Sequence, residues 1–300
     1  MASTRNNIEQ QGVLALDCPL RGDIHGDRSV MDFPFFGLEK KPQMGVIEHK
    51  VGSTTITIRA GESGIATMYD KEIILYVASL IYERMVRSQA YTQEMVFTAH
   101  DFFRATGTPN PGKREYQRFT DAMSRLQGTQ VQTNLKTGGS GHRGWFSWIE
   151  NAQVIYDNAP EGFEKLRAVK VRLCDFLFRA IEHDVSMYSY HHEYFQLGLI
   201  ERRLYEIARS HCKTDEPFEI DLGQLYKTVG SRSVVRRFKQ HLMMIEQQDT
   251  LPHYRMSIRD EVDGDRVRAK PSETFVTFTE RPRGIGPGRY FQNTLELIDA

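Results

Sequence analysis

The chain has few cysteines, no net charge and no long apolar run. Its 300 residues include three cysteines, Cys18, Cys174 and Cys212, whose odd number and wide spacing argue against a disulfide framework or a zinc knuckle. No apolar run approaches the ~20 residues of a membrane-spanning helix, and the N-terminus lacks the apolar segment of a signal peptide. We therefore expect a cytoplasmic protein with reduced thiols and no membrane partner.

The formal net charge is zero, with 39 basic and 39 acidic side chains. Proteins that bind nucleic acid usually carry a basic excess, so a DNA-binding function would require the charge to be segregated onto particular faces. The length predicts about two domains, each large enough for a hydrophobic core. A basic surface must therefore be sought on individual elements.

Residues 99–126 predict a short helix, a turn and a longer helix. The short helix spans Ala99 to Thr106 and ends at Gly107, because the prolines that follow prevent its continuation. The longer helix has one apolar stripe, formed by Tyr116, Phe119, Met123 and Leu126. Its opposite face is mostly basic, with Asp121 as its one acid, and supplies candidate DNA contacts: Lys113, Arg114, Gln117, Arg118 and Arg125. Two helices joined by such a turn are a unit with which proteins read DNA.

A strand, a flexible loop and a second strand are predicted directly after this pair of helices. Residues 131–133 and 145–149 have strand character, and the loop 136–144 between them is rich in glycine. We interpret this hairpin as the β-wing that accompanies a helix-turn-helix. Its loop offers Lys136, His142 and Arg143 as contacts to DNA.

A second copy of the pattern follows later in the chain. Residues 220–230 align with residues 97–107, and Val235, Phe238, Leu242 and Ile245 repeat the spacing of the first apolar stripe. Residues 231–245 contain no acid, which favours this helix as the reader of base edges. Its candidate contacts are Ser231, Arg232, Ser233, Arg236, Arg237, Lys239 and Gln240. Strands at 254–259 and 274–279 form the second wing, with Arg266 in its loop. The apolar stripes are predicted to be core, Met243 included.

These elements predict an α+β protein of two tandem winged-helix domains. Residues 1–30 are expected to form a flexible arm, residues 31–184 the first domain, and residues 185–300 the second domain with an irregular tail. Residues 54–59 alternate like a half-buried strand, and Asp70 is placed to cap a helix that supports the first helix-turn-helix. The helix at 198–211 supports the second.

Two enzymatic alternatives have weak support. Residues 107–113 have the spacing of a phosphate-binding loop, but Arg114 follows the lysine where a serine or threonine would hold magnesium, and two prolines remove backbone donors. The adjacent His191 and His192 suggest a metal or nicking site, yet adjacent side chains of a strand point to opposite faces and no metal-ligand spacing is present. We therefore predict no catalytic residue, no metal and no cofactor.

Several motifs spaced along the chain resemble the replication initiator protein A family of bacterial plasmids, over roughly residues 33–258. They are Gly64-Ile-Ala-Thr-Met-Tyr-Asp70 with Ile73-Ile-Leu and Ala78-Ser79, Ser124-Arg-Leu-Gln-Gly-Thr129, Val131-Gln-Thr-Asn134, and Tyr194-Phe-Gln-Leu197 with Glu201-Arg202 and Leu204-Tyr205. Arg203 stands where this pattern leads us to expect a tryptophan. The resemblance implies two winged-helix domains that bind direct repeats, called iterons, at a plasmid origin.

The function expected from these features is that of a plasmid replication initiator that binds double-stranded origin DNA. The resemblance further implies opening of an AT-rich segment, recruitment of a host initiator and a replicative helicase, and dimerisation through the first domain. The main alternative is a winged-helix transcriptional regulator or autorepressor of a plasmid operon, which an effector pocket or an inverted-repeat operator would favour.

Overall fold

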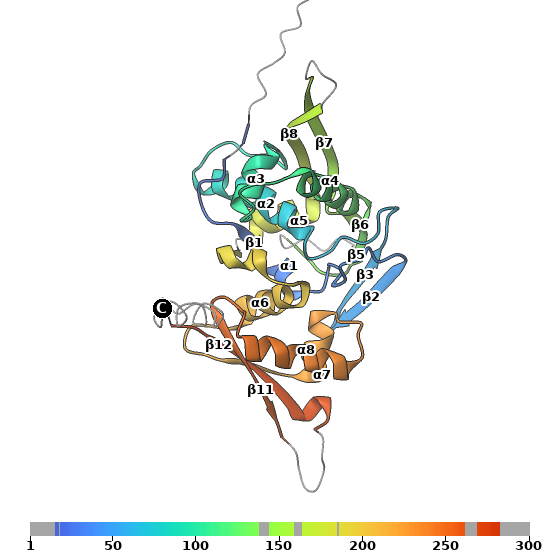
Figure 1. The fold of residues 1–300 in the computed structure, drawn as a ribbon, viewed down its shortest axis with the longest axis vertical. Helices are drawn as coiled ribbons and strands as arrows, with labels where there is room; N and C mark the ends of the chain where they lie inside the picture. The colour runs from blue at the N-terminus through green and yellow to red at the C-terminus, as the bar shows by residue number, and fades with distance from the viewer. Residues whose placement is uncertain are drawn as a thin grey trace, which may run out of the picture.

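The computed structural model describes residues 16–17, 19–137, 144–158, 164–184, 186–261 and 269–282 (Figure 1). The helices are α1 (Arg28–Asp32), α2 (Lys71–Val86), α3 (Ala99–Ala105), α4 (Lys113–Gly128), α5 (Asp175–Arg179), α6 (Leu199–His211), α7 (Leu222–Val229) and α8 (Val235–Gln248). A π-helical turn, Ala180–Asp184, follows α5, and short 3-10 helices span His192–Gln196 and Pro271–Glu273. No helix in these ranges has the length and apolar character that crossing a membrane requires.

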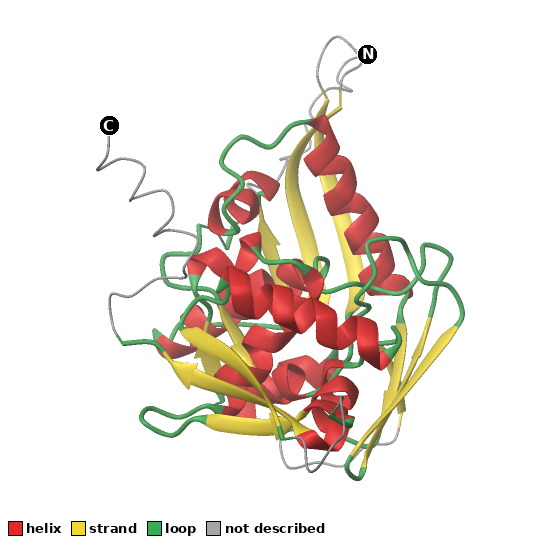
Figure 2. Cartoon of the chain, turned by 60° about the horizontal axis from the view of Figure 1, so that its bottom comes forward, coloured by secondary structure: helices red, strands yellow, loops and turns green. Residues whose placement is uncertain are grey.

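The strands form four antiparallel sheets within these ranges. They are β1 (His25–Asp27), β2 (Val46–Val51), β3 (Thr54–Arg59), β4 (Glu94–Phe97), β5 (Gln130–Thr133), β6 (Gly144–Ser147), β7 (Ile149–Asn158), β8 (Glu164–Leu173), β9 (Met187–Ser189), β10 (Phe218–Asp221), β11 (Tyr254–Asp260) and β12 (Thr274–Glu280). The chain is therefore a mixed helix and strand protein. Figure 2 shows helices gathered in the middle, with strands in separate groups around them.

One order of elements occurs twice. The first unit consists of β4, α3, α4, β7 and β8, and the second unit consists of β10, α7, α8, β11 and β12. Their sheets have matching orders, β4-β8-β7 and β10-β12-β11. In Figure 1 the β7–β8 and β11–β12 hairpins extend from opposite ends of the molecule, with α6 between them. The same order of elements and the same sheet order therefore accompany both helix pairs.

This topology corrects the position of the first wing. The predicted strands around residues 136–144 are present as β5 and β6, but they belong to a separate sheet of order β2-β3-β5-β6. In the second unit the hairpin after the helices is β11–β12, and its counterpart by sheet order is β7–β8. Sequence order alone suggested β5–β6 because this hairpin is inserted directly after α4.

Helix α6 is the buried centre of the fold. Arg202, Arg203, Leu204 and Glu206 on it are all at most 1% exposed. Glu206 pairs with Lys71 of α2 at 2.6 Å, and the hydroxyls of Tyr190 and Tyr194 donate to the same carboxylate. A charged network thus connects the helix that supports the first unit to the helix that supports the second.

Arg203 replaces the expected tryptophan without leaving its charge unpaired. Its guanidinium donates to the backbone carbonyls of Met31, Asp32 and Thr228 and lies 3.5 Å from the carboxylate of Glu206. Burial lowers the pKa of this guanidinium, while Glu206 and Asp32 raise it. A buried arginine is tolerated here because several acceptors surround it.

The folded chain begins earlier than the predicted arm allows. Strand β1 lies inside residues 1–30, and helix α1 begins inside them and ends at Asp32. Ile24 and Val30 are buried. Strand β1 pairs with β9, which lies just after residue 185. This short sheet therefore joins segments from both sides of the predicted domain division, which itself stays a prediction.

The second unit is packed against β2. Gly230 ends α7 with φ of 78°, and a Cβ at this position would lie 2.5 Å from Pro34 and 3.1 Å from the ring of His49. Only glycine fits this conformation at such close approach. Burial, and then the charges of Arg203 and Arg232, lower the pKa of His49 to about 4.

Candidate nucleic-acid interface

Helix α4 presents a polar face to solvent. Phe119, Met123 and Leu126 are buried beneath it, as the apolar stripe predicted. The candidates Lys113, Arg114, Gln117 and Arg118 are exposed on the outside. Gln117 donates to Asp121 at 2.8 Å, so the one acid of this face holds the amide of a neighbouring candidate.

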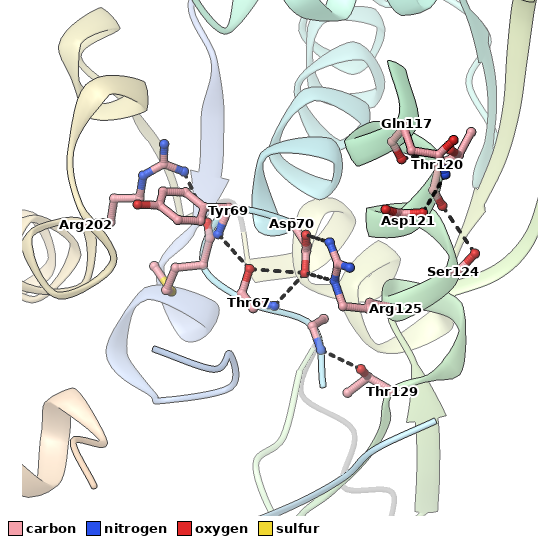
Figure 3. Close-up of polar contacts among 12 residues, drawn as sticks. Thr67, Tyr69, Asp70, Gln117, Thr120, Asp121, Ser124, Arg125, Thr129 and Arg202 are labelled. Atoms are coloured by element: carbon pink, nitrogen blue, oxygen red, sulfur yellow. Dashed lines mark hydrogen bonds and ion pairs between the residues drawn. The ribbon is translucent and has the colours of Figure 1, made fainter. Parts of the chain in front are cut away.

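Arg125 does not belong to this outer face. Its guanidinium makes two hydrogen bonds to the carboxylate of Asp70, at 2.8 Å and 2.7 Å, and its side chain is 17% exposed (Figure 3). Asp70 begins α2 as predicted, but makes no capping bond through its side chain; it accepts instead from Arg125 and from Thr67. The prediction of Arg125 as a DNA contact is therefore corrected, because the arginine already neutralises a buried acid.

Helix α8 begins at Val235, so the first three candidate contacts of the second copy lie before the helix. Ser231, Arg232 and Ser233 lie in the turn between α7 and α8 rather than on the helix face. The hydroxyl of Tyr226 donates to the carbonyl of Ser233 at 2.8 Å, which fixes this turn. Arg232 is exposed, whereas the two serines are partly buried.

The outward face of α8 carries Arg236, Arg237 and Gln240, all exposed as predicted. Lys239 is different, because its ammonium group donates to both carboxylate oxygens of Asp260, at 2.6 Å and 2.7 Å, and to Thr274. The hydrogen bond from Lys239 lowers the pKa of Asp260. Lys239 thus ties α8 to its hairpin. Met243 is 51% exposed, so its assignment to the core is wrong.

Several cations without an acidic partner lie on or beside the two helix pairs. In the part of the chain that the structure describes, Arg114, Arg118, Arg232, Arg236 and Arg237 form no ion pair. Nearby cations that do form one are Arg104 with Asp101, Arg125 with Asp70, Lys239 with Asp260, and Arg259 with Glu219 and Glu261. The neutral chain therefore has locally unbalanced positive charge on its paired helices.

The loop candidates are only partly placed. Lys136 is exposed after β5, in the hairpin of the separate sheet. His142, Arg143 and Arg266 lie outside the described residues. Two further exposed lysines, Lys50 on β2 and Lys227 near the end of α7, escaped the sequence reasoning. Lys227 could have been found by counting the charged residues along α7. Lys50 lies near the α7–α8 turn only because β2 packs beside that turn.

The residues of the two enzymatic alternatives can also be placed. Lys113 is the first residue of α4, and the turn before it joins two helices rather than a strand and a helix. The ring of His191 lies 4.3 Å from that of His192 and 4.5 Å from that of His253. Burial, and then His253 and His192, lower the pKa of His191 to about 4. Among the described residues, no group of three or more His, Cys, Asp or Glu side chains is placed to hold a metal.

The described cysteines, Cys174 and Cys212, are free thiols, while Cys18 lies outside the described residues. Cys174 is buried, which raises its pKa to about 12. A thiol in this state is unreactive near neutral pH. Neither cysteine is placed among the candidate contacts.

Comparison with known proteins gives consistent matches. A family model described as replication initiator protein A matches residues 25–256. A protein named "Putative replication protein" from Wigglesworthia glossinidia brevipalpis is 28% identical over 254 residues, which cover 84% of this chain and 86% of that protein.

Two solved structures are similar in fold. A crystal structure of domains 2 and 3 of RctB has a TM-score of 0.58 at 12% identity, covering 83% of this chain and 96% of that one. A second structure of RctB domains 2–3 has a TM-score of 0.53 at 13% identity, covering 82% and 95%. At these identities the likeness concerns the fold alone.

Proposed function

The chain belongs to the replication initiator protein A family, and from this premise we propose that it initiates plasmid replication by binding direct repeats of duplex DNA at the origin. The first and second units each act as a winged-helix domain. Their outer helices, α4 and α8, enter successive major grooves, and the hairpins β7–β8 and β11–β12 serve as wings beside the backbone.

The observation that carries the proposal is the distribution of unpaired cations. Arg114 and Arg118 on α4, and Arg236 and Arg237 on α8, lie exposed at the same outer face of a duplicated unit. None of the four forms an ion pair within the described residues, whereas the neighbouring Arg104 and Arg125 do. Phosphates supply the missing negative charge, and DNA binding then releases counterions.

The two helices have different tasks. Helix α8 has no acid on its outer face, and its exposed arginines can each make a bidentate bond to a guanine edge. Helix α4 carries Asp121, which repels phosphate, and its Gln117 is held by that acid. We therefore assign base discrimination mainly to the second unit and general affinity mainly to the first.

Three further parts of the proposal rest on the family and not on contacts in this chain. A host initiator and a replicative helicase are recruited, an AT-rich segment opens, and the protein dimerises through the first unit when free of DNA. Light scattering with and without a single repeat tests the last part. A dimer that stays intact on one repeat would contradict it.

The protein carries out this role without its own catalytic centre. The loop before Lys113 joins two helices, and its prolines cannot donate backbone hydrogen bonds to phosphate. Origin opening therefore depends on binding energy and on partners.

Nuclease protection of the DNA that flanks the gene tests the binding proposal. The expected result is protection of several direct repeats of equal orientation. Protection of one inverted repeat at the promoter alone would favour the transcriptional regulator. If the purified full chain protects no segment at low salt, the proposal is wrong.

A further inference from the structure

We propose that β2 of the β2–β3 hairpin forms, together with the α7–α8 turn, a groove that binds one phosphodiester strand of the DNA contacted by α8. This inference rests on the proposed function and adds an element that neither helix pair contains. It makes Lys50 and Lys227 DNA-contacting residues. The contact extends the second unit's binding surface onto a segment that precedes the first unit in sequence.

The groove is formed where two distant segments meet. A hollow of about 490 Å³ is lined on one side by β2, including His49 and Lys50, and on the other by Lys227, Ser231 and Arg232. A second hollow of about 380 Å³ shares His49, Ser231 and Arg232 and continues towards Arg237 on α8. The surface therefore leads from the hairpin to the outward face of α8.

The charge of the groove fits a phosphate strand. Lys50, Lys227, Arg232 and Arg237 line it, and none of them forms an ion pair in the described part of the chain. The acids that line the same two hollows are Glu39 and Glu48, so the cations are in excess. Unpaired cations that face one hollow from two sides repel each other unless an anion lies between them.

The two walls are held in fixed positions. Gly230 packs against Pro34 and the ring of His49, and β2 is paired with β3 along its whole length. On the other wall, the bond from Tyr226 to Ser233 fixes the turn. The groove is thus preformed, and a bound strand needs no reordering of either wall.

The groove between β2 and the α7–α8 turn is placed to contact the sugar-phosphate backbone and not the base edges. In a helix-turn-helix the second helix enters the major groove while the helix before it crosses the backbone. The α7–α8 turn and the end of α7 therefore lie beside a phosphate strand when α8 is docked. Lys50 is on the adjoining wall, so the same strand passes within its reach.

Phosphate ethylation interference on an origin duplex tests this contact with the full chain. Wild-type binding should be weakened by ethylation of a phosphate that flanks the α8 site, and this sensitivity should vanish in Lys50→Gln. At 0.1 M salt the loss of one phosphate contact should weaken binding about eightfold and reduce the salt slope by about 0.9. Lys227→Gln should behave alike at a neighbouring phosphate. Lys50→Arg should retain the affinity, and Arg21→Gln, an equal charge change away from both hollows, should change affinity by less than about twofold.

Each outcome bears on the groove contact, on the proposed function, or on both. If wild type binds the duplex but Lys50→Gln keeps the same affinity, salt slope and ethylation pattern, the groove contact is wrong while the proposed function stands. Weaker binding with an unchanged slope would show that Lys50 acts through structure, which also contradicts the contact. Failure of the wild type to bind any origin duplex would overturn the proposed function and this inference with it.

Discussion

Removal of the Lys71 ammonium group should destabilise the fold strongly. Lys71 and Glu206 are each 1% exposed and lie 2.6 Å apart, so Lys71→Met leaves a buried carboxylate without its closest cation. Breaking a buried ion pair on one side costs about 3–5 kcal/mol. We expect the lower end, about 3 kcal/mol, because Arg203 and the hydroxyls of Tyr190 and Tyr194 still face the carboxylate.

A second variant tests whether the unpaired buried charge causes this penalty. Adding Glu206→Gln to Lys71→Met removes the unpaired charge and leaves an acceptor for the tyrosine hydroxyls. The double variant should therefore be more stable than Lys71→Met alone, by about 1–2 kcal/mol.

Urea unfolding followed by the fluorescence of Trp148 provides the assay, because this side chain is fully buried. Trp145 is 62% exposed, so Trp145→Phe serves as the background. Lys213→Met is the matched control, because Lys213 pairs with Glu216 at 3.2 Å on the exposed surface. This substitution should lower the free energy of unfolding by less than about 1 kcal/mol. The reasoning would be refuted if Lys71→Met lowered the free energy of unfolding by less than about 1 kcal/mol. It would also be refuted if the effects of Lys71→Met and Glu206→Gln simply added in the double variant.

Three other predictions follow from the corrected and buried contacts. Arg125→Met should lower the free energy of unfolding by about 2 kcal/mol, because Asp70 is left buried, whereas Arg118→Met should change it by less than about 0.5 kcal/mol; equal effects in urea unfolding would contradict the corrected role. The folded pKa of His49, about 4, lies below its unfolded value of 6.5, so the unfolded chain binds more protons between these values and stability should fall as the pH drops from 6.5 to 4, by at most about 3 kcal/mol. His49→Gln should flatten that part of the pH profile, and an unchanged profile would argue against the buried neutral ring. ATP hydrolysis and DNA nicking should be absent with magnesium or manganese, and any turnover that Lys113→Ala or His192→Ala abolishes would overturn the non-enzymatic assignment.

Local patterns predicted the helix pairs well. The strand at residues 54–59, the helix from Ala99 and the apolar stripes of α4 and α8 all follow from spacing within one element. Such spacing determines which side of a helix can be buried, whatever lies beneath it. The strand-loop-strand after α4 is also predicted correctly, but its assignment as the wing is not, because sheet membership depends on pairing with β3, far earlier in the chain.

The errors at the site have a common cause in long-range partners. A helical wheel places Arg125 on the outside, but Asp70, 55 residues earlier, draws its guanidinium inward. Lys239 likewise finds Asp260 on the following hairpin. Met243 was assigned to the core by its apolar character, but no element of the described fold covers it. The proximity of Lys50 to the α7–α8 turn depends on the packing of β2 beside Gly230, which no local sequence pattern indicates.

The central claim is that exposed arginines of α8 discriminate sequence while those of α4 supply affinity. Its most direct test is a salt-titrated binding series on repeat and scrambled duplexes for Arg236→Ala, Arg237→Ala, Arg114→Ala and Arg118→Ala. At least one of the two α8 substitutions should lower the binding free energy for the repeat duplex by about 1–3 kcal/mol and weaken the base preference at one base pair. Either change in α4 should weaken binding to both duplexes alike and lower the salt slope by about one. If both α8 variants keep the repeat-to-scrambled ratio while Arg114→Ala collapses it, the claim is contradicted.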